Sequence, residues 1–345
     1  MRTAPLSIVL FTAAVSAASL VATPTRAEDP TKAALPNLSS RLTSIHFYVD
    51  GGRLQAVANE PSVERDTSSD LGGTSRREKL IVSTNADQDA SIEYDLLTGD
   101  EILTANVVDG RQFTISRRPK SAGGAAVEFN QPQDGPLALV VKENGKSREV
   151  KGATIWHLLI AEPELCGRHL IPLLEMFRAD WHLAETARSV EAQMLRTASE
   201  FREENLHAWD ALVADLASDR FAERQRAERE LRAAGATVIP YLQGLDRRRL
   251  DFEQLSRIQH IIDAADNDDE DRAEGVASRL MADRQVWLVL LDRPQESTRR
   301  TAAGALSYLS GEPISFDPAA PASVRGRQLE SLRKQITAET PAGAK

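Results

Sequence analysis

The residues most suggestive of metal chemistry surround the single cysteine of the chain. Cys166 and His169 lie three positions apart, and His157 and His182 are nearby. Structural zinc sites normally combine two such closely spaced pairs, whereas this region offers one. Cys166 also falls on an apolar helical stripe, where a free cysteine packs as a small hydrophobic residue. We interpret Cys166 as a core residue and expect no metal ion, no cofactor and no internal disulfide.

Two other segments resemble ligand-binding loops in composition only. The acidic run Asp266–Asp271 lacks the Gly and the Glu that a helix–loop–helix calcium site needs at its sixth and twelfth positions. We interpret it as a solvated linker, with weak cation binding as the alternative. Gly145-Lys146-Ser147 matches the end of a phosphate-binding loop, but Val140 stands where that loop requires Gly. A hairpin turn is expected there instead.

Arginines and tryptophans are further candidates for binding. The run Arg247-Arg248-Arg249 is expected to end a helix, where cations meet unpaired carbonyl groups; docking of an acidic partner is the alternative. The tryptophans lie on apolar helical stripes or at their starts, which predicts core packing rather than exposed binding positions. They are Trp156, Trp181, Trp209 and Trp287.

Catalytic motifs are not recognisable in the chain. The patterns Gly-x-Ser-x-Gly and His-Glu-x-x-His are missing, and no Ser, His and Asp are spaced so as to suggest a triad. We therefore predict a protein that is not an enzyme and assign no catalytic residue. Catalytic groups dispersed along the chain would escape such a search.

The first half of the chain has the periodicity of β-strands. Between residues 42 and 150, apolar side chains recur at every second position. Asp50-Gly51, Asp109-Gly110 and Asn144-Gly145 interrupt this pattern with the residues that tight hairpin turns favour. Eight or nine short strands, each with one apolar and one polar face, predict an antiparallel sheet or sandwich.

Around Gly152 the apolar period changes from two to 3.6 residues, which predicts helices from there onward. The two halves are then expected to be separable, unless the start of the helical half covers the sheet. The residues that would do so are Ile155, Trp156, Leu158 and Leu159.

The clearest helical unit extends from Leu206 to Leu245. Asp219 stands where a helix cap is expected, and Gly235 suits the left-handed position after a helix end. The apolar stripe between them consists of Phe221, Ala227, Leu231 and Ala234. Neither of the two short helices in this unit can bury its apolar edge alone, so the unit is expected to stack on similar units. A second unit is recognisable from Trp287 to Gly311.

These stretches carry a resemblance to a known class of proteins. Asp219–Leu242 and Asp292–Pro318 look like the HEAT-like (armadillo-type) helical repeats of bacterial exported proteins. The resemblance covers about residues 205–336 and implies an α-solenoid that serves as an interaction scaffold, without catalytic residues. In those arrays an Arg-Trp-rich helix usually follows the Asp-Pro pair, whereas Arg327–Ile336 has no Trp.

The N-terminal segment has the layout of a secretory signal peptide. Arg2 precedes the apolar run 6–22, and a cleavage site ends at Ala27. The whole chain has a formal net charge of −9, and removing residues 1–27 takes away two arginines and no acid. That much negative charge repels phosphate backbones, so nucleic acid is not expected as a partner.

The sequence therefore predicts an α+β multidomain protein with an antiparallel β-rich sheet or sandwich and a helical HEAT-like solenoid. Its expected parts are a signal peptide (1–27), a linker (28–41), the β-rich domain (42–152), a helical connector (153–204) and the repeat domain (205–340). We expect an exported protein, periplasmic or extracellular, that does not span a membrane after cleavage and binds another protein as a non-catalytic scaffold. The alternatives are binding of an envelope glycan or lipid through the β-rich domain, or an enzyme with dispersed catalytic residues.

Overall fold

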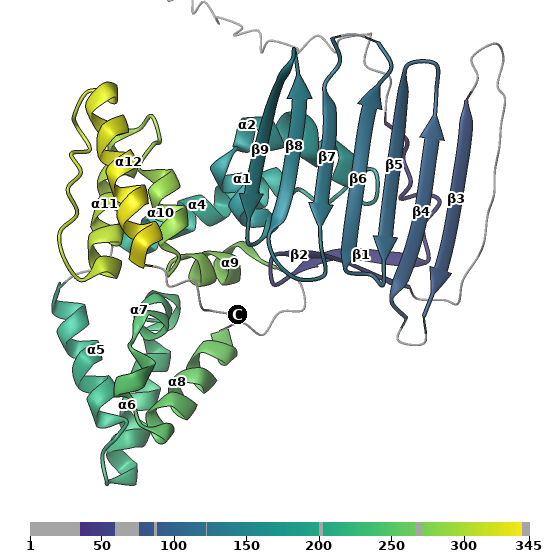
Figure 1. The fold of residues 1–345 in the computed structure, drawn as a ribbon. Helices are drawn as coiled ribbons and strands as arrows, with labels where there is room; N and C mark the ends of the chain where they lie inside the picture. The colour runs from purple at the N-terminus through teal and green to yellow at the C-terminus, as the bar shows by residue number, and fades with distance from the viewer. Residues whose placement is uncertain are drawn as a thin grey trace, which may run out of the picture. The chain divides into compact units, whose positions relative to one another are not determined.

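The computed structural model describes residues 35–58, 76–85, 88–121, 123–199, 203–265 and 271–339. They form an antiparallel β-sheet region followed by a helical region (Figure 1). Residues from Pro36 onward cluster as one compact unit. The predicted signal peptide, its cleavage site at Ala27 and residues 28–34 of the linker lie outside the described residues.

The described part of the chain contains nine strands. Neighbours in the sequence pair antiparallel, except β2 and β3, which belong to different sheets. A separate hairpin consists of β1 (Ile45–Asp50) and β2 (Arg53–Ala58). A seven-stranded meander follows: β3 (Arg77–Thr84), β4 (Ala90–Leu97), β5 (Glu101–Val108), β6 (Gln112–Pro119), β7 (Ala126–Gln131), β8 (Leu137–Glu143) and β9 (Lys146–Gly152). The predicted antiparallel sheet is thus present.

Hairpin turns occur close to where the sequence predicts them. Asp109 and Gly110, and likewise Asn144 and Gly145, have positive φ, as a tight hairpin turn between twisted strands requires. The first turn is displaced by one residue from the expected Asp50-Gly51. Asp50 still pairs with Arg53 across the strands, so the two turn residues with positive φ are the glycines at positions 51 and 52.

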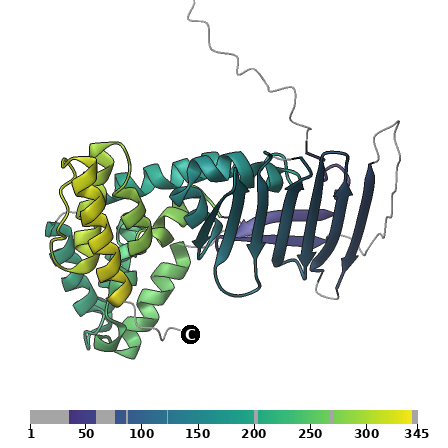
Figure 2. The ribbon, with the colours of Figure 1, turned by 45° about the horizontal axis from the view of Figure 1, so that its top comes forward.

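One face of the meander is buried and the other is open. On the buried face, the amide of Gln131 exchanges two hydrogen bonds with the backbone of Leu54, at 2.9 and 2.8 Å, which fastens the β1–β2 hairpin to the sheet. The hairpin and the first helices lie behind the strands in Figure 1, and Figure 2 shows the hairpin on the same side. The opposite face carries the polar half of each alternating strand.

The helical region begins directly after the sheet. Its first part comprises α1 (Ile155–Ala161), α2 (Pro163–Leu165), a π-helical turn (Cys166–Leu170), α3 (Ile171–Glu175) and α4 (Leu183–Ser199). The π turn ends two residues before Pro172, whose nitrogen cannot donate a helical hydrogen bond. Ile155, Trp156, Leu158 and Leu159 are buried, and α1 packs against β9, so the helical half contributes to the core of the sheet.

A second group of helices shares an apolar core of its own. It comprises α5 (Glu203–Asp215), α6 (Phe221–Ala233), α7 (Ile239–Gly244) and α8 (Phe252–Ala265), with short 3-10 turns at Gly235–Thr237 and Arg247–Arg249. Leu231 and Leu242 belong to this core. The cap of α6 differs from the expected Asp219: Arg220 holds that position, and its N–H donates to the Ser218 hydroxyl at 3.1 Å.

Four more helices complete the described chain: α9 (Ala273–Leu280), α10 (Arg284–Leu290), α11 (Glu296–Ser310) and α12 (Ala322–Glu339). α10 packs against α11 and α12, and α9 packs against α4. Among the helices of the described ranges, none is both long enough and apolar enough to cross a lipid bilayer.

Candidate functional site on helix α8

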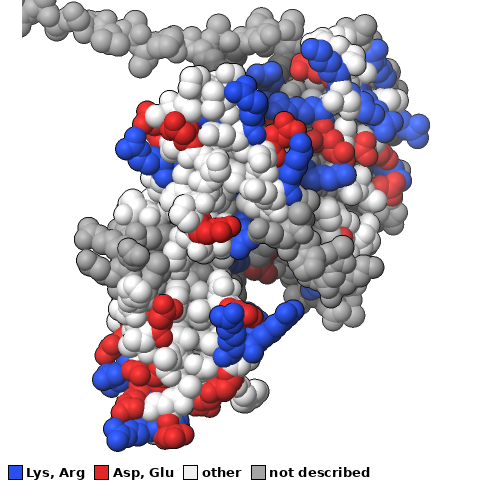
Figure 3. Space-filling view, turned by 60° about the vertical axis from the view of Figure 1, so that its left-hand side comes forward, with Lys and Arg blue, Asp and Glu red and all other residues white. Residues whose placement is uncertain are grey.

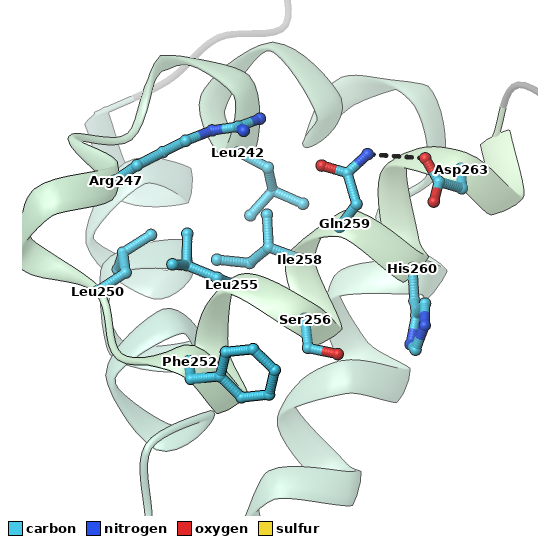
Figure 4. A pocket seen from close by; sticks show the side chains of 10 residues that line it. All are labelled: Leu242, Arg247, Leu250, Phe252, Leu255, Ser256, Ile258, Gln259, His260 and Asp263. Carbon is cyan, nitrogen blue, oxygen red and sulfur yellow. Dashed lines mark hydrogen bonds between the residues drawn. The ribbon is translucent and has the colours of Figure 1, made fainter.

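The most exposed large apolar side chain among the described residues is Phe252, the first residue of α8, at 86% exposure. It borders a groove of about 460 Å³ between α7, the Arg247–Arg249 turn and α8. Leu250 and Leu255 form its half-buried walls, and the buried Leu242 contributes to its floor (Figure 4).

A reciprocal cap sets the start of α8 and hence the position of Phe252. The backbone N–H of Asp251 donates to Gln254 Oε1 at 2.9 Å, and the N–H of Gln254 donates to Asp251 Oδ1 at 2.7 Å. This capping box satisfies two backbone donors at the helix start. The Gln254 amide also donates to the Val213 carbonyl at 2.8 Å, which ties α8 to α5. The cap therefore holds Phe252 at the first helical position, outside the core.

An arginine side chain borders the same groove. Arg247 extends across one side of it (Figure 4). Arg249 lies 3.4 Å from Asp246, whereas Arg247 and Arg248 form no ion pair with any of the residues that the structure describes. The three arginines form their own 3-10 turn after α7 ends at Gly244, so the expectation that they end a helix is wrong.

The sequence pattern does not single out Phe252 and places Phe221 on an apolar stripe. Phe221 is instead 58% exposed, with the Arg224 guanidinium 5.7 Å from its ring centroid. Each phenylalanine precedes a fully or largely buried residue, Ala227 or Ile258, by six positions. Six residues correspond to about 240° around a helix, which turns both rings away from the core. The angle between each phenylalanine and the buried residue six positions later would have predicted from the sequence that both rings are exposed.

The four tryptophans are buried, as predicted. The indole of Trp209 packs on the ring of Tyr241, with 5.5 Å between the centroids. The indole N–H of Trp287 donates to the carbonyl of Met281 at 2.7 Å. These side chains therefore stabilise the fold and do not form an exposed binding surface.

The cysteine and histidines of the predicted cluster have separate surroundings. The Cys166 thiol is buried and donates to the Leu158 carbonyl at 3.3 Å; burial raises its pKa to about 12. His182 is exposed beside Glu185, at 3.9 Å. Within the described ranges, the side chains of His, Cys, Asp and Glu form no group of three or more that could hold a metal ion.

His157 lies between a hydroxyl and a carboxylate, an arrangement that resembles part of a catalytic triad. Its Nδ1 is 2.7 Å from Thr154 Oγ1, and its Nε2 is 2.9 Å from Asp283 Oδ2. Thr154 and Asp283 are, however, the N-cap residues of α1 and α10, and Asp283 Oδ1 accepts from the N–H of Gln285 at 2.7 Å. We interpret this group as a structural contact that links the start of α1 to the start of α10.

The electrostatics of Asp283 agree with that structural role. Burial disfavours its charged form, but the hydrogen bond and the charge of His157 outweigh burial. Together with the backbone N–H groups of Gln285 and Val286, they hold the pKa of Asp283 below its ordinary value of 3.8. The carboxylate therefore stays ionised at neutral pH and acts as an acceptor.

The two segments that resemble ligand-binding loops in composition have structural roles where the structure describes them. Of the acidic run, residues 266–270 lie outside the described residues, and Asp271 is a buried acceptor for the indole N–H of Trp156. Asn144 and Gly145 form the β8–β9 turn, so Gly145-Lys146-Ser147 is a hairpin and the start of β9.

The arrangement on α8 therefore combines one exposed aromatic ring, aliphatic walls and Arg247, which forms no ion pair with the described residues. Elsewhere, the face drawn in Figure 3 intersperses acidic and basic side chains with uncharged surface. Comparison of the whole chain with models of protein families, with curated proteins and with solved structures finds no match.

Proposed function

We propose that the chain is an exported, non-catalytic scaffold that binds another protein through its helical surface, at the α8 groove. The observation that carries this proposal is Phe252, with 86% of its surface exposed beside an apolar groove. Burying such a side chain in a partner contributes about 1.5–3 kcal/mol. Aromatic and arginine side chains are also the residues in which binding energy concentrates.

The chemistry of the groove indicates the kind of partner segment. Leu250 and Leu255 offer aliphatic contacts, and Arg247 offers positive charge at the rim. Arg248 follows Arg247 in the same 3-10 turn. A segment with an apolar side chain flanked by carboxylates complements both. Asp263, which accepts a hydrogen bond of 2.7 Å from Gln259, is the carboxylate on the opposite side of the groove. A bound acidic segment is therefore expected to place its charges at the arginine side.

Further parts of the proposal draw on other observations. The apolar core shared by α5 to α8, and the packing of α10 on α11 and α12, support a HEAT-like array. His157 links two N-cap residues and Cys166 lies in the core, and both roles support a non-catalytic protein. Export rests on the signal-peptide pattern of residues 1–27.

Site-specific photo-crosslinking tests the groove. A benzoylphenylalanine is placed at position 252, or at position 221 as the matched control, in the full chain expressed in its native cells. Phe221 is also the exposed first residue of a helix, but it lies on α6. We expect a discrete protein adduct at position 252 and none of the same mass at position 221.

Charge reversal beside the groove tests whether the crosslink depends on the proposed site. Arg247→Glu combined with Arg248→Glu should abolish the adduct at position 252 without changing the melting temperature by more than a few degrees. Equal adducts at both positions, or an adduct at position 252 that survives charge reversal, would contradict the proposed site. An adduct of twice the chain mass would identify the partner as a second copy.

A further inference from the structure

The open face of the seven-stranded sheet carries a row of side chains that is distinct from the α8 groove. Cross-strand pairing aligns Arg77 with Leu97, Leu97 with Ile102, and Ile102 with Arg118. Farther across the sheet, Ala126 pairs with Lys142 and Lys142 with Ser147. We call this set the basic row: Arg77, Leu97, Ile102, Arg118, Ala126, Lys142 and Ser147. With strands about 4.8 Å apart, it extends roughly 29 Å across the sheet.

The basic row lies at the end of the sheet where β4, β6 and β8 terminate, the upper end in Figure 1. Two further lysines belong to the turns at this end. Lys120 follows β6 and donates from Nζ to the Thr98 carbonyl at 2.6 Å, and Lys146 begins β9. The carboxylates of the same turns are Asp100 and Glu143. The basic row and these turns together therefore contain five cations and two acids.

Ion pairing distinguishes the basic row from the rest of the open face. Lys79 pairs with Glu93 at 2.7 Å, and Lys151 pairs with Glu149 at 3.0 Å. By contrast, the three cations of the basic row make no ion pair with any described residue. They are Arg77, Arg118 and Lys142. Carboxylates of the adjacent row stand diagonally, about 7 Å away by strand geometry; they are Asp95, Glu128 and Glu149.

The basic row also exposes two aliphatic side chains between its arginines. Leu97 is 39% exposed and Ile102 is 38% exposed, and they are direct cross-strand partners. Guanidinium groups bind phosphate oxygens in pairs of hydrogen bonds, and aliphatic side chains beside them favour the boundary of acyl chains and head groups. A soluble polyanion would use the cations but gain nothing from Leu97 and Ile102.

We propose that the basic row is a docking surface for the phosphate layer of an anionic lipid membrane. The chain as a whole is acidic, with a net charge of −9, so the attraction is local and must be strongest at low salt. Binding would orient the sheet with the ends of β4, β6 and β8 toward the lipid. This surface does not involve the α8 groove, so the two proposals stand or fall separately.

Vesicle sedimentation of the full chain tests the proposal with a matched pair of variants. The test variant combines Arg118→Glu and Lys142→Glu. The control combines Lys79→Glu and Lys151→Glu, which makes the same charge change on the same face, at cations that are already paired. With vesicles of phosphatidylglycerol and phosphatidylethanolamine, the test variant should bind at least about fivefold less than the parent. The control should stay within about twofold.

A local probe separates this surface from any other membrane-binding part of the chain. An environment-sensitive dye is attached at Ser147→Cys in the basic row, or at Thr114→Cys elsewhere on the open face. The native Cys166 is buried and its thiol has a pKa of about 12, so the dye reacts with the introduced cysteine. Only the dye at position 147 should shift to the blue, with phosphatidylglycerol vesicles and not with phosphatidylcholine.

Two outcomes would overturn the proposal. In the first, the dye at position 147 gives no shift that depends on anionic lipid, or both charge-reversal variants lose binding equally. In the second, soluble polyphosphate displaces the vesicles completely and Leu97→Ser with Ile102→Ser leaves binding unchanged. That result would assign the basic row to a soluble acidic polymer or an acidic protein.

Discussion

The carboxylate of Asp271 accepts a hydrogen bond of 2.6 Å from the indole Nε1 of Trp156, although 115 positions separate the two residues. The same oxygen accepts from the N–H of Gly52 at 2.7 Å, and the other oxygen accepts from Arg279. The N–H of Asp271 donates to the Val49 carbonyl at 2.8 Å. One buried carboxylate therefore joins the β1–β2 hairpin, α1 and α9.

Removing the indole donor should destabilise the protein measurably. Trp156→Phe leaves an acceptor position of a buried carboxylate unfilled, which is expected to cost about 1.5–3 kcal/mol of unfolding free energy beyond lost packing. Trp181→Phe is the control, because its indole Nε1 is buried without a partner among the described residues. Urea denaturation of both variants checks this contrast. Equal losses would show that the Asp271 bond contributes little.

Asp283 should make stability depend on pH in the acid range. Its folded-state pKa lies below 3.8, so the ionised form contributes stability that is present above that value and lost as pH falls through the folded pKa. Asp283→Asn keeps a cap oxygen for Gln285 but removes the charge beside His157. We expect the variant to be about 1 kcal/mol less stable at pH 7. Denaturant melts should show this difference in unfolding free energy begin to decrease as the pH falls below 3.8 and vanish below the folded pKa.

A comparable carboxylate serves as the control for that experiment. Asp246 accepts from the N–H of Arg248 at 3.1 Å and lies beside Arg249, whose side chain is highly exposed. Asp246→Asn should change stability by less than about 0.5 kcal/mol at either pH. A difference in unfolding free energy for Asp283→Asn that stays constant as the pH falls far below 3.8 would contradict the role assigned to its charge.

Two adjacent residues of α6 should differ sharply in their effect on stability. Leu231 is fully buried in the α5–α8 core, so Leu231→Ala should cost about 2–5 kcal/mol through lost burial and a cavity. Glu230 is exposed and lies 3.8 Å from Arg226, and Glu230→Ala should cost less than about 0.5 kcal/mol. Chemical denaturation followed by circular dichroism measures both. Similar values would mean that α6 is rotated from the orientation described.

Two turn glycines provide a test of close packing between the hairpin and the sheet. Gly110 and Gly145 both have positive φ, but only a methyl group on Gly110 would meet another chain segment, 2.4 Å from the Ala56 carbonyl oxygen. Gly145→Ala should cost about 1–2 kcal/mol through backbone strain alone. Gly110→Ala should cost at least about 1 kcal/mol more, because the 2.8 Å bond from Ala56 N–H to the Gly110 carbonyl must shift. Thermal melts that rank Gly145→Ala as equally harmful would argue against this contact.

Local patterns were enough to predict the strands, the change to helices and the buried tryptophans. They were less accurate at the ends of elements, where a neighbouring residue can take the expected position. Arg220 and not the expected Asp219 is the N-cap residue of α6, and the first hairpin turn is formed by Gly51 and Gly52 and not by Asp50 and Gly51. Such shifts of one or two positions cost little free energy and leave no periodic signature.

The site and the long-range contacts required more than periodicity. Phe252 is exposed because a capping box fixes the helix start and its ring lies far around the helix from Ile258. Asp271 contacts residues of the β1–β2 hairpin, α1 and α9. Contacts between segments so far apart in the sequence cannot be predicted from a local pattern. Pairing across the open sheet face likewise becomes visible only once the register is known, as with Leu97 and Ile102.

The order of the strands has a consequence for how the chain acquires its structure. Every strand of the meander pairs with its neighbour in the sequence, so the sheet has low contact order and can form quickly. The bond from Gly52 to Asp271 spans 219 positions, and the entropy of closing a loop that long delays it. A chain emerging N-terminus first would thus display the apolar face of the sheet before the covering helices arrive. Pulse-labelled hydrogen exchange should show β4 to β8 protected before Gly52, and this interval is when a holdase chaperone would be most needed.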